Sequence, residues 1–245
     1  MRGRAPVATL TAFATIATKK HNQQIAMSIR PVRIYPLGDE ALVCESPPPA
    51  TLDVQRRVWA VAALARDWPQ VEEVVPGMNN LTITFDPLSA DRDALAAQLD
   101  AAWRDAGDTG IAGRDIEIPV QYGGEFGPDL DAVAAHTGLT AQQVIERHAA
   151  GQYVVFFVGF QPGFAYMGGL DASLHTPRRK EPRVAVPTGS VGIGGEQTGV
   201  YPAASPGGWQ LIGRTPVALF DPAAKPPALL LPGDRVRFTI AGSHS

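Results

Sequence analysis

Basic side chains gather in one short run, PRRKEPRV, in the second half of the chain. The run contains Arg178, Arg179, Lys180 and Arg183. A guanidinium is planar and can donate two parallel hydrogen bonds to a carboxylate or a phosphate. Arg178 and Arg183 are therefore candidate ligands for a substrate carboxylate or a phosphorylated oxygen. A solvated charged loop has the same composition and is an equally good interpretation.

Aromatic residues surround this basic run. Tyr166 and Tyr201 carry hydroxyls that can donate a hydrogen bond to an amide oxygen, so both are candidate substrate-binding residues. Phe164 and Trp209 lie beside glycines and are candidate walls of a small pocket. Plain core packing is slightly favoured for these last two.

Neutral polar residues occur in the same stretch. Ser190, Gln197 and Gln210 supply hydrogen-bond donors and acceptors that suit a lactam or a urea group. Turns use the same residue types routinely, and for each residue alone that interpretation is favoured. The three residues are candidate substrate ligands, and no catalytic residue emerges from the sequence.

Standard catalytic signatures are missing from the sequence. It contains no GxxxxGK[ST] phosphate loop, no HExxH and no GxSxG. The glycine-rich stretch 189–197 fails the dinucleotide fingerprint, because Gln197 stands where the third glycine belongs. The five histidines have no spacing that would place two of them toward one metal. We therefore expect no metal ligated by this chain alone.

Composition narrows the class of protein further. The chain has 245 residues, of which 45% are hydrophobic and 18% charged, as in a compact protein with a sizeable core. A net charge of -3 without a basic stripe argues against a nucleic-acid partner. Cys44 is the single cysteine, which excludes an intramolecular disulfide and favours a reducing cytoplasm. No segment is suited to anchoring in a membrane.

Three regions are predicted along the chain. Residues 1–29 are expected to form a disordered extension, with Met27 as the true initiator. Residues 30–113 are expected to form an α+β domain, with strands near 32–35, 41–44, 71–75 and 81–85. Its helices are marked by apolar residues at helical spacing, and Gly107 is expected to cap the second.

Residues 114–242 are predicted to form a β-barrel or sandwich. A strand at 116–120 precedes two short helices at 128–136 and 140–148. Short apolar runs then alternate with Gly and Pro turns, as in closed β-structures. These runs are at 153–158, 184–186, 211–212, 217–220 and 236–240.

Three runs carry a resemblance to a known family. They are GFQPGFAYMGGLD, PRRKEPRVAVPTGSVGIGGEQTGVYP and SPGGWQLIGRTP. They resemble the family that holds the B subunit of 5-oxoprolinase, the sporulation-kinase inhibitor and allophanate hydrolase subunit 1, which also forms half of the carboxyltransferase domain of urea carboxylase. The resemblance runs from about Arg30 to Gly242. It implies that the second domain is a cyclophilin-like β-barrel.

The resemblance also implies a function and partners. A protein similar to the B subunit of 5-oxoprolinase acts with the A and C subunits to open 5-oxoproline to glutamate, using ATP. The ATP site is not located in this chain, and activity of the chain alone is not expected. Two alternatives stay open, because fold does not settle function. One is a histidine-kinase inhibitor, and the other is a subunit of a urea- or allophanate-type amide carboxylase or hydrolase.

Overall fold

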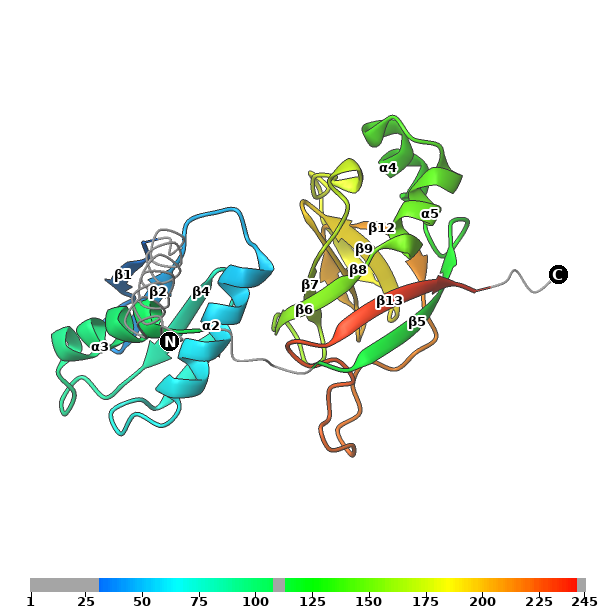
Figure 1. Ribbon diagram of the computed structural model, residues 1–245. Coiled ribbons are helices and arrows are strands. Elements are labelled where there is room, and N and C mark those ends of the chain that lie inside the picture. The colour runs from blue at the N-terminus through cyan, green and yellow to red at the C-terminus, as the bar shows by residue number, and fades with distance from the viewer. Residues whose placement is uncertain (1–30, 108–112, 242–245) are drawn as a thin grey trace, which may run out of the picture.

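The computed structural model describes residues 31–107 and 113–241. Figure 1 shows a sheet covered by helices in the first range and a β-barrel in the second. Each part has its own cluster of buried hydrophobic residues. The expected extension at residues 1–29, including Met27, lies outside the described residues. The domain boundary at 113/114 adjoins residues 108–112, which are also outside them, and stays a prediction.

The first part is built on an antiparallel sheet with strand order β1-β2-β4-β3. Its strands are β1 (Arg33–Pro36), β2 (Ala41–Glu45), β3 (Glu73–Pro76) and β4 (Asn80–Thr84). In β4 the side chains of Leu81 and Ile83 are buried, whereas Thr82 and Thr84 are half-buried. This alternation is the two-residue period that predicts the strand from the sequence.

Helices α2 (Leu52–Ala65) and α3 (Arg92–Asp105) pack on the sheet. The side chain of Thr51 caps α2 by accepting a hydrogen bond from the backbone N–H of Val54. The expected glycine cap of α3 is wrong. That helix is capped by Ala106, and Gly107 does not adopt the positive φ that favours glycine at helix ends.

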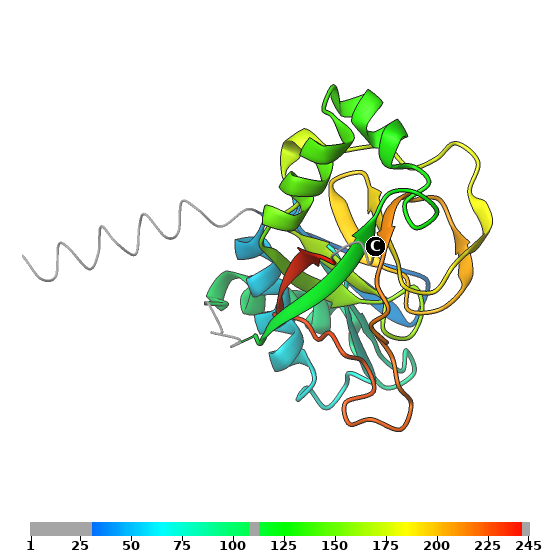
Figure 2. The ribbon, with the colours of Figure 1, turned by 90° about the vertical axis from the view of Figure 1, so that its right-hand side faces the viewer.

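The second part is a closed barrel with strand order β10-β7-β6-β13-β5-β12-β9. Its strands are β5 (Asp115–Tyr122), β6 (Tyr153–Val158), β7 (Ala165–Gly168), β9 (Ser190–Gly194), β10 (Gln197–Val200), β12 (Gln210–Arg214) and β13 (Arg235–Ile240). Strands β5 and β13 are parallel and lie side by side in Figures 1 and 2, although they are far apart in the sequence. The closed barrel agrees with the expected architecture. Its likeness to cyclophilins stays a prediction.

Glycine-rich strands β9 and β10 are absent from the sequence prediction. A Cβ atom at Gly194 would lie 2.5 Å from the indole nitrogen of Trp209, and one at Gly199 would lie 3.2 Å from the same ring system. The glycines therefore make room for a buried tryptophan. The strand expected at 217–220 is wrong, since that segment makes only an isolated bridge between Phe220 and Ala228.

Elements outside the barrel complete this part. Strand β8 (Arg183–Val186) pairs with β11 (Ser205–Gly207) as a separate ribbon. Helices α4 (Leu130–Thr137) and α5 (Ala141–Ala150) lie on one side of the barrel in both views, near the short helix η1 (Ala172–Leu174). Thr140 and Gln143 form the predicted capping box at the start of α5.

His148 is fully buried where α5 meets the barrel. Its Nδ1 lies 2.7 Å from the hydroxyl of Tyr122, and its Nε2 lies 2.9 Å from the hydroxyl of Thr198. Thr198 donates its own proton to the carbonyl of Gly192, so it accepts from Nε2–H, and Tyr122 donates to Nδ1. A neutral imidazole satisfies every partner. Burial lowers the pKa of His148 to about 3.

We expect His148 to make the free energy of unfolding depend on pH. The unfolded chain takes up this proton near pH 6.5, whereas the folded chain resists it down to about pH 3. Stability from this source is therefore complete above pH 6.5 and falls as pH drops toward 3, by about 2 kcal/mol between pH 7 and 5. Urea unfolding at both pH values should show that His148→Gln loses this difference. The exposed His136, changed to Gln, is the control and should leave the difference unchanged.

Candidate functional site

One backbone carbonyl joins the two parts of the molecule. The carbonyl oxygen of Phe156, in β6, accepts hydrogen bonds from Gln55 Nε2 at 3.2 Å and from Trp59 Nε1 at 2.8 Å. Both donors belong to α2, and Gln55 is completely buried. The pairing of β6 with β7 is irregular between Val155 and Phe157. This irregularity leaves the Phe156 carbonyl available to α2.

Gln55 also holds the turn between β3 and β4. Its Nε2 donates to the carbonyl of Gly77 at 3.1 Å, and its Oε1 accepts from the backbone N–H of Asn79 at 3.4 Å. The carbonyl of Asn79 accepts from the backbone N–H of Ser46 at 2.8 Å. Asn79 has φ of 60°, a left-handed conformation that asparagine tolerates better than most residues. The turn is thus fixed on both sides.

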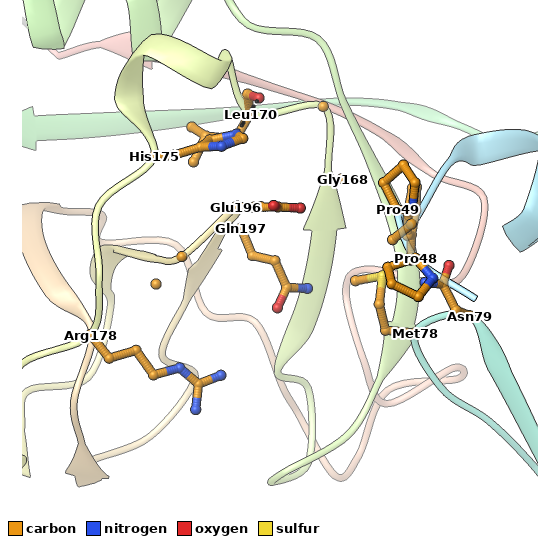
Figure 3. A pocket seen from close by; sticks show the side chains of 15 residues that line it. Pro48, Pro49, Met78, Asn79, Gly168, Leu170, His175, Arg178, Glu196 and Gln197 are labelled. Atoms are coloured by element: carbon orange, nitrogen blue, oxygen red, sulfur yellow. Dashed lines mark hydrogen bonds between the residues drawn. The ribbon is translucent and has the colours of Figure 1, made fainter. Parts of the chain in front are cut away.

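A cleft of about 580 Å³ opens where the two parts meet. Figure 3 shows side chains from both parts facing it. The first part contributes Pro48, Pro49, Ala50, Met78 and Asn79. The barrel part contributes Phe156, Gly168, Gly169, Leu170, His175, Arg178, Gly194, Gly195, Glu196 and Gln197. Ligand sites occur preferentially at such boundaries.

Gln197 reaches into the cleft from a tight hairpin. Strands β9 and β10 are joined by the two-residue loop Gly195-Glu196, and Gly195 has φ of 68°, as such hairpin loops require. Figure 3 shows Gln197 between Arg178 on one side and Met78 and Asn79 on the other. The glycine-rich stretch is therefore a hairpin that presents a carboxamide.

Arg178 is the candidate arginine that lines the cleft, and its binding of a substrate stays a prediction. It is exposed, lines the cleft and lies 5.8 Å from the ring centre of Trp209. Gln210 Nε2 donates to the carbonyl of Pro177, and the backbone N–H of Arg179 donates to that of Gly208. These bonds hold the backbone on both sides of Arg178. Among the described residues, Arg178 forms no ion pair, so its guanidinium is free to bind an anion.

Arg183 and Arg179 have a different environment. Asp129 is buried, and its Oδ1 accepts from Arg183 Nη2 at 2.7 Å and from Arg179 Nη1 at 3.1 Å. Its Oδ2 accepts from the backbone N–H of Leu211 at 2.7 Å. This network ties the start of α4 to β8 and β12. The structure therefore keeps Arg183 out of the cleft and occupies it with a carboxylate.

The candidate aromatic residues form a cluster of their own. Phe164, Tyr201 and Trp209 are buried together, with ring centres 5.3 to 6.4 Å apart, and Tyr166 packs against them. None of the four lines the cleft. Burial raises the pKa of both Tyr166 and Tyr201, so their phenols stay protonated at neutral pH. Their contact with a substrate stays a prediction.

The remaining candidates are also placed away from the cleft or used structurally. Ser190 is buried in β9 and its hydroxyl has no hydrogen-bond partner among the described residues, but it does not line the cleft. Gln210 is bonded to Pro177, as described above. Burial, with a smaller effect from Asp100, raises the pKa of the Cys44 thiol to about 12, so this cysteine is no nucleophile.

Residues 31–107 and 113–241 contain neither a metal-binding cluster nor a helix able to cross a membrane. No three His, Cys, Asp or Glu side chains there gather in a group able to hold a metal ion. No helix in the same ranges combines the length and apolar character needed to cross a membrane.

Asn79 is one of the cleft residues that sequence reasoning missed. The run Pro-Gly-Met-Asn-Asn predicts a turn, and asparagine is common where φ is positive. That signal explains the backbone but not the cleft, because only the packing of α2 on β6 brings the turn to the barrel. His175 and Glu196 are not among the residues predicted from the sequence either, yet both line the cleft.

Comparison with known proteins decides the family. The model of the carboxyltransferase domain, subdomain C and D, matches residues 32–230. The chain belongs to this family. The B subunit of 5-oxoprolinase from Escherichia coli O157:H7 is 55% identical over 207 residues, which make up 84% of this chain and 94% of that protein. The resemblance stated from the sequence is confirmed.

Two solved structures extend the comparison. The crystal structure of TTHA0988 aligns with a TM-score of 0.69 and 36% identity, covering 87% of this chain and only 41% of that longer chain. The K. lactis urea amidolyase aligns with a TM-score of 0.74 and 21% identity, covering 86% of this chain and 15% of that chain. At this identity the second match shows a shared fold alone.

We expect Arg183 and Arg178 to differ in their effect on stability. Arg183→Met removes a charge-assisted hydrogen bond from buried Asp129 and should lower the free energy of unfolding by about 2 kcal/mol. Arg178→Met removes only an exposed contact with Trp209 and should cost about 1 kcal/mol or less. Urea unfolding of the two variants measures both. Equal losses would show that the Asp129 network does not stabilise the fold as its geometry indicates.

Proposed function

We propose that this chain is the B subunit of an ATP-dependent 5-oxoprolinase, acting with the A and C subunits. The reaction converts 5-oxo-L-proline, ATP and water to L-glutamate, ADP and phosphate. The observation that carries the proposal is the 55% identity to a protein named as the B subunit of 5-oxoprolinase, across 94% of its length. A subunit implies other subunits, and we propose the C subunit as the direct partner.

The cleft supports a role in binding a small acidic amide. 5-Oxoproline carries a carboxylate and a lactam, and the cleft presents Arg178 together with the carboxamides of Gln197 and Asn79. A free guanidinium suits the carboxylate. If Arg178 binds the carboxylate, the lactam of 5-oxoproline is directed toward the carboxamides of Gln197 and Asn79. The ATP site lies elsewhere in the complex in this proposal.

A second candidate is a subunit of a urea- or allophanate-type amide carboxylase or hydrolase. The shared fold with the K. lactis urea amidolyase favours it. Urea has no carboxylate, so a urea substrate would give Arg178 no anionic partner, whereas allophanate carries a carboxylate and would give it one. Arg178 therefore separates 5-oxoproline from urea but not from allophanate.

The first test is reconstitution. We expect 5-oxoproline-dependent ATP hydrolysis and glutamate release when the full chain is mixed with the A and C subunits, and neither when it is omitted. Both products are measured, because ATP hydrolysis without glutamate would indicate an uncoupled reaction. Full activity without this chain, or carboxylation of urea in its place, would refute the proposed function.

Arg178 should affect one substrate and not the other. In the reconstituted complex, Arg178→Gln should raise the KM for 5-oxoproline about tenfold or more, since a charged hydrogen bond is lost. The KM for ATP should not change. Lys180→Gln is the matched control, because Lys180 is an exposed neighbour that does not line the cleft. An unchanged KM for 5-oxoproline would remove Arg178 from the site.

A further inference from the structure

Two side chains that line the cleft each carry a buried polar atom with no hydrogen-bond partner among the described residues. One is Asn79 Oδ1, an acceptor on the first part of the molecule. The other is Gln197 Nε2, a donor on the barrel. Buried polar atoms in native proteins are almost always paired, because leaving one unpaired is costly. Two of opposite character at one cavity point to a ligand that supplies both partners.

Each of the two side chains is held in place by its backbone. The backbone of Asn79 is bonded through its N–H to Gln55 and through its carbonyl to Ser46, in a left-handed conformation. Gln197 starts β10 directly after the tight Gly195-Glu196 loop and pairs with Gly194. The backbone positions from which the two carboxamides project are therefore fixed. Such preorganisation lowers the entropy lost on binding.

We propose that Asn79 and Gln197 together recognise the amide group of the substrate. Asn79 Oδ1 accepts the amide N–H, and Gln197 Nε2 donates to the amide carbonyl oxygen. Arg178, on the other side of Gln197 in Figure 3, takes the carboxylate. The ligand is thus an acidic amide or lactam bound across both parts of the chain. Naming it 5-oxoproline rests on the proposed function, whereas the pairing of donor and acceptor does not.

Other polar groups at the cleft agree with this orientation. Glu196 is exposed and carries a negative charge, and in Figure 3 it lies toward His175 and Gly168, away from Arg178. A ligand carboxylate near Glu196 would be repelled. His175 Nε2 lies 3.3 Å from the carbonyl of Leu170. The anionic end of the ligand therefore belongs at Arg178.

Two variants test the pair without disturbing the backbone. Asn79→Gly removes the acceptor, and glycine adopts φ of 60° readily, so the turn is kept. Gln197→Glu keeps the shape of the side chain but replaces the donor with a charged acceptor. Gln142→Glu, on the exposed face of α5, makes the same chemical change outside the cleft and is the control. Urea unfolding of all three checks that they fold.

The measurement is binding of 5-oxo-L-proline, without ATP, to the full chain assembled with the A and C subunits, by isothermal titration calorimetry. We expect Asn79→Gly and Gln197→Glu each to weaken binding about tenfold or more, as expected when one partner of a buried hydrogen bond is lost. Gln142→Glu should bind like the unchanged chain. Either cleft variant binding with unchanged affinity, or no binding by the unchanged chain, would overturn the inference.

Turnover separates this inference from the proposed function. Normal 5-oxoproline hydrolysis by the unchanged complex, together with an unchanged KM in both cleft variants, would leave the function standing and remove the amide recognition. No hydrolysis by the unchanged complex would refute the function itself. In that case, binding of 5-oxo-L-proline that depends on both Asn79 and Gln197 would still support an acidic-amide site.

Discussion

The position of one carbonyl group, that of Phe156, governs how the site is assembled. A strand carbonyl is normally used by the neighbouring strand, but the irregular pairing of β6 with β7 turns this one toward α2. Gln55 and Trp59 then both donate to it. Because Gln55 also bonds the turn that carries Asn79, a single buried side chain fixes the distance between that turn and the barrel.

The side chain of Phe156, on the same strand β6, lines the cleft. A Cβ atom at Gly168, on β7, would lie 2.3 Å from the ring of Phe156, so only glycine leaves room for the ring there. Gly194, at the end of β9, likewise leaves room for the ring of Trp209, and Arg178 lies over that ring. Two barrel glycines thus leave space for two aromatic rings. The ring of Phe156 lines the cleft, and the ring of Trp209 contacts Arg178.

Local pattern was enough to predict much of the fold. Alternation at Leu81 and Ile83 and the capping box at Thr140 are short-range signals, and they predict β4 and α5 correctly. Strands β9 and β10 were missed because glycines are typical of turns. Their place in strands depends on Trp209, from a later segment, which packs against them. The parallel pairing of β13 with β5 has no local signature at all. The strand expected at 217–220 failed because apolar residues alone do not supply a pairing partner.

The site was less predictable than the fold for the same reason. Residue type pointed to Arg178 and Arg183 equally, since both have the same chemistry in the same run. The two arginines differ in their ion pairing. Asp129, about fifty positions earlier in the chain, binds Arg183, whereas Arg178 forms no ion pair with a described residue. Asn79 was predicted only as a turn residue, because its position at the cleft depends on a contact between α2 and β6 that the sequence does not display.

The described residues that line the cleft suit binding better than covalent attack. They include no Ser, Thr, Cys, Tyr or Lys, and two deeply buried reactive groups elsewhere in the fold, Cys44 and His148, are held neutral in cores. Opening a lactam with ATP requires phosphoryl transfer and an activated water. In the function we propose, this chain binds the carboxylate and both sides of the amide, and so orients the substrate for groups that another subunit supplies. That proposed division fits a cleft that holds no hydroxyl, thiol or lysine nucleophile among its described lining residues, where His175 and Glu196 are the titratable side chains beside Arg178.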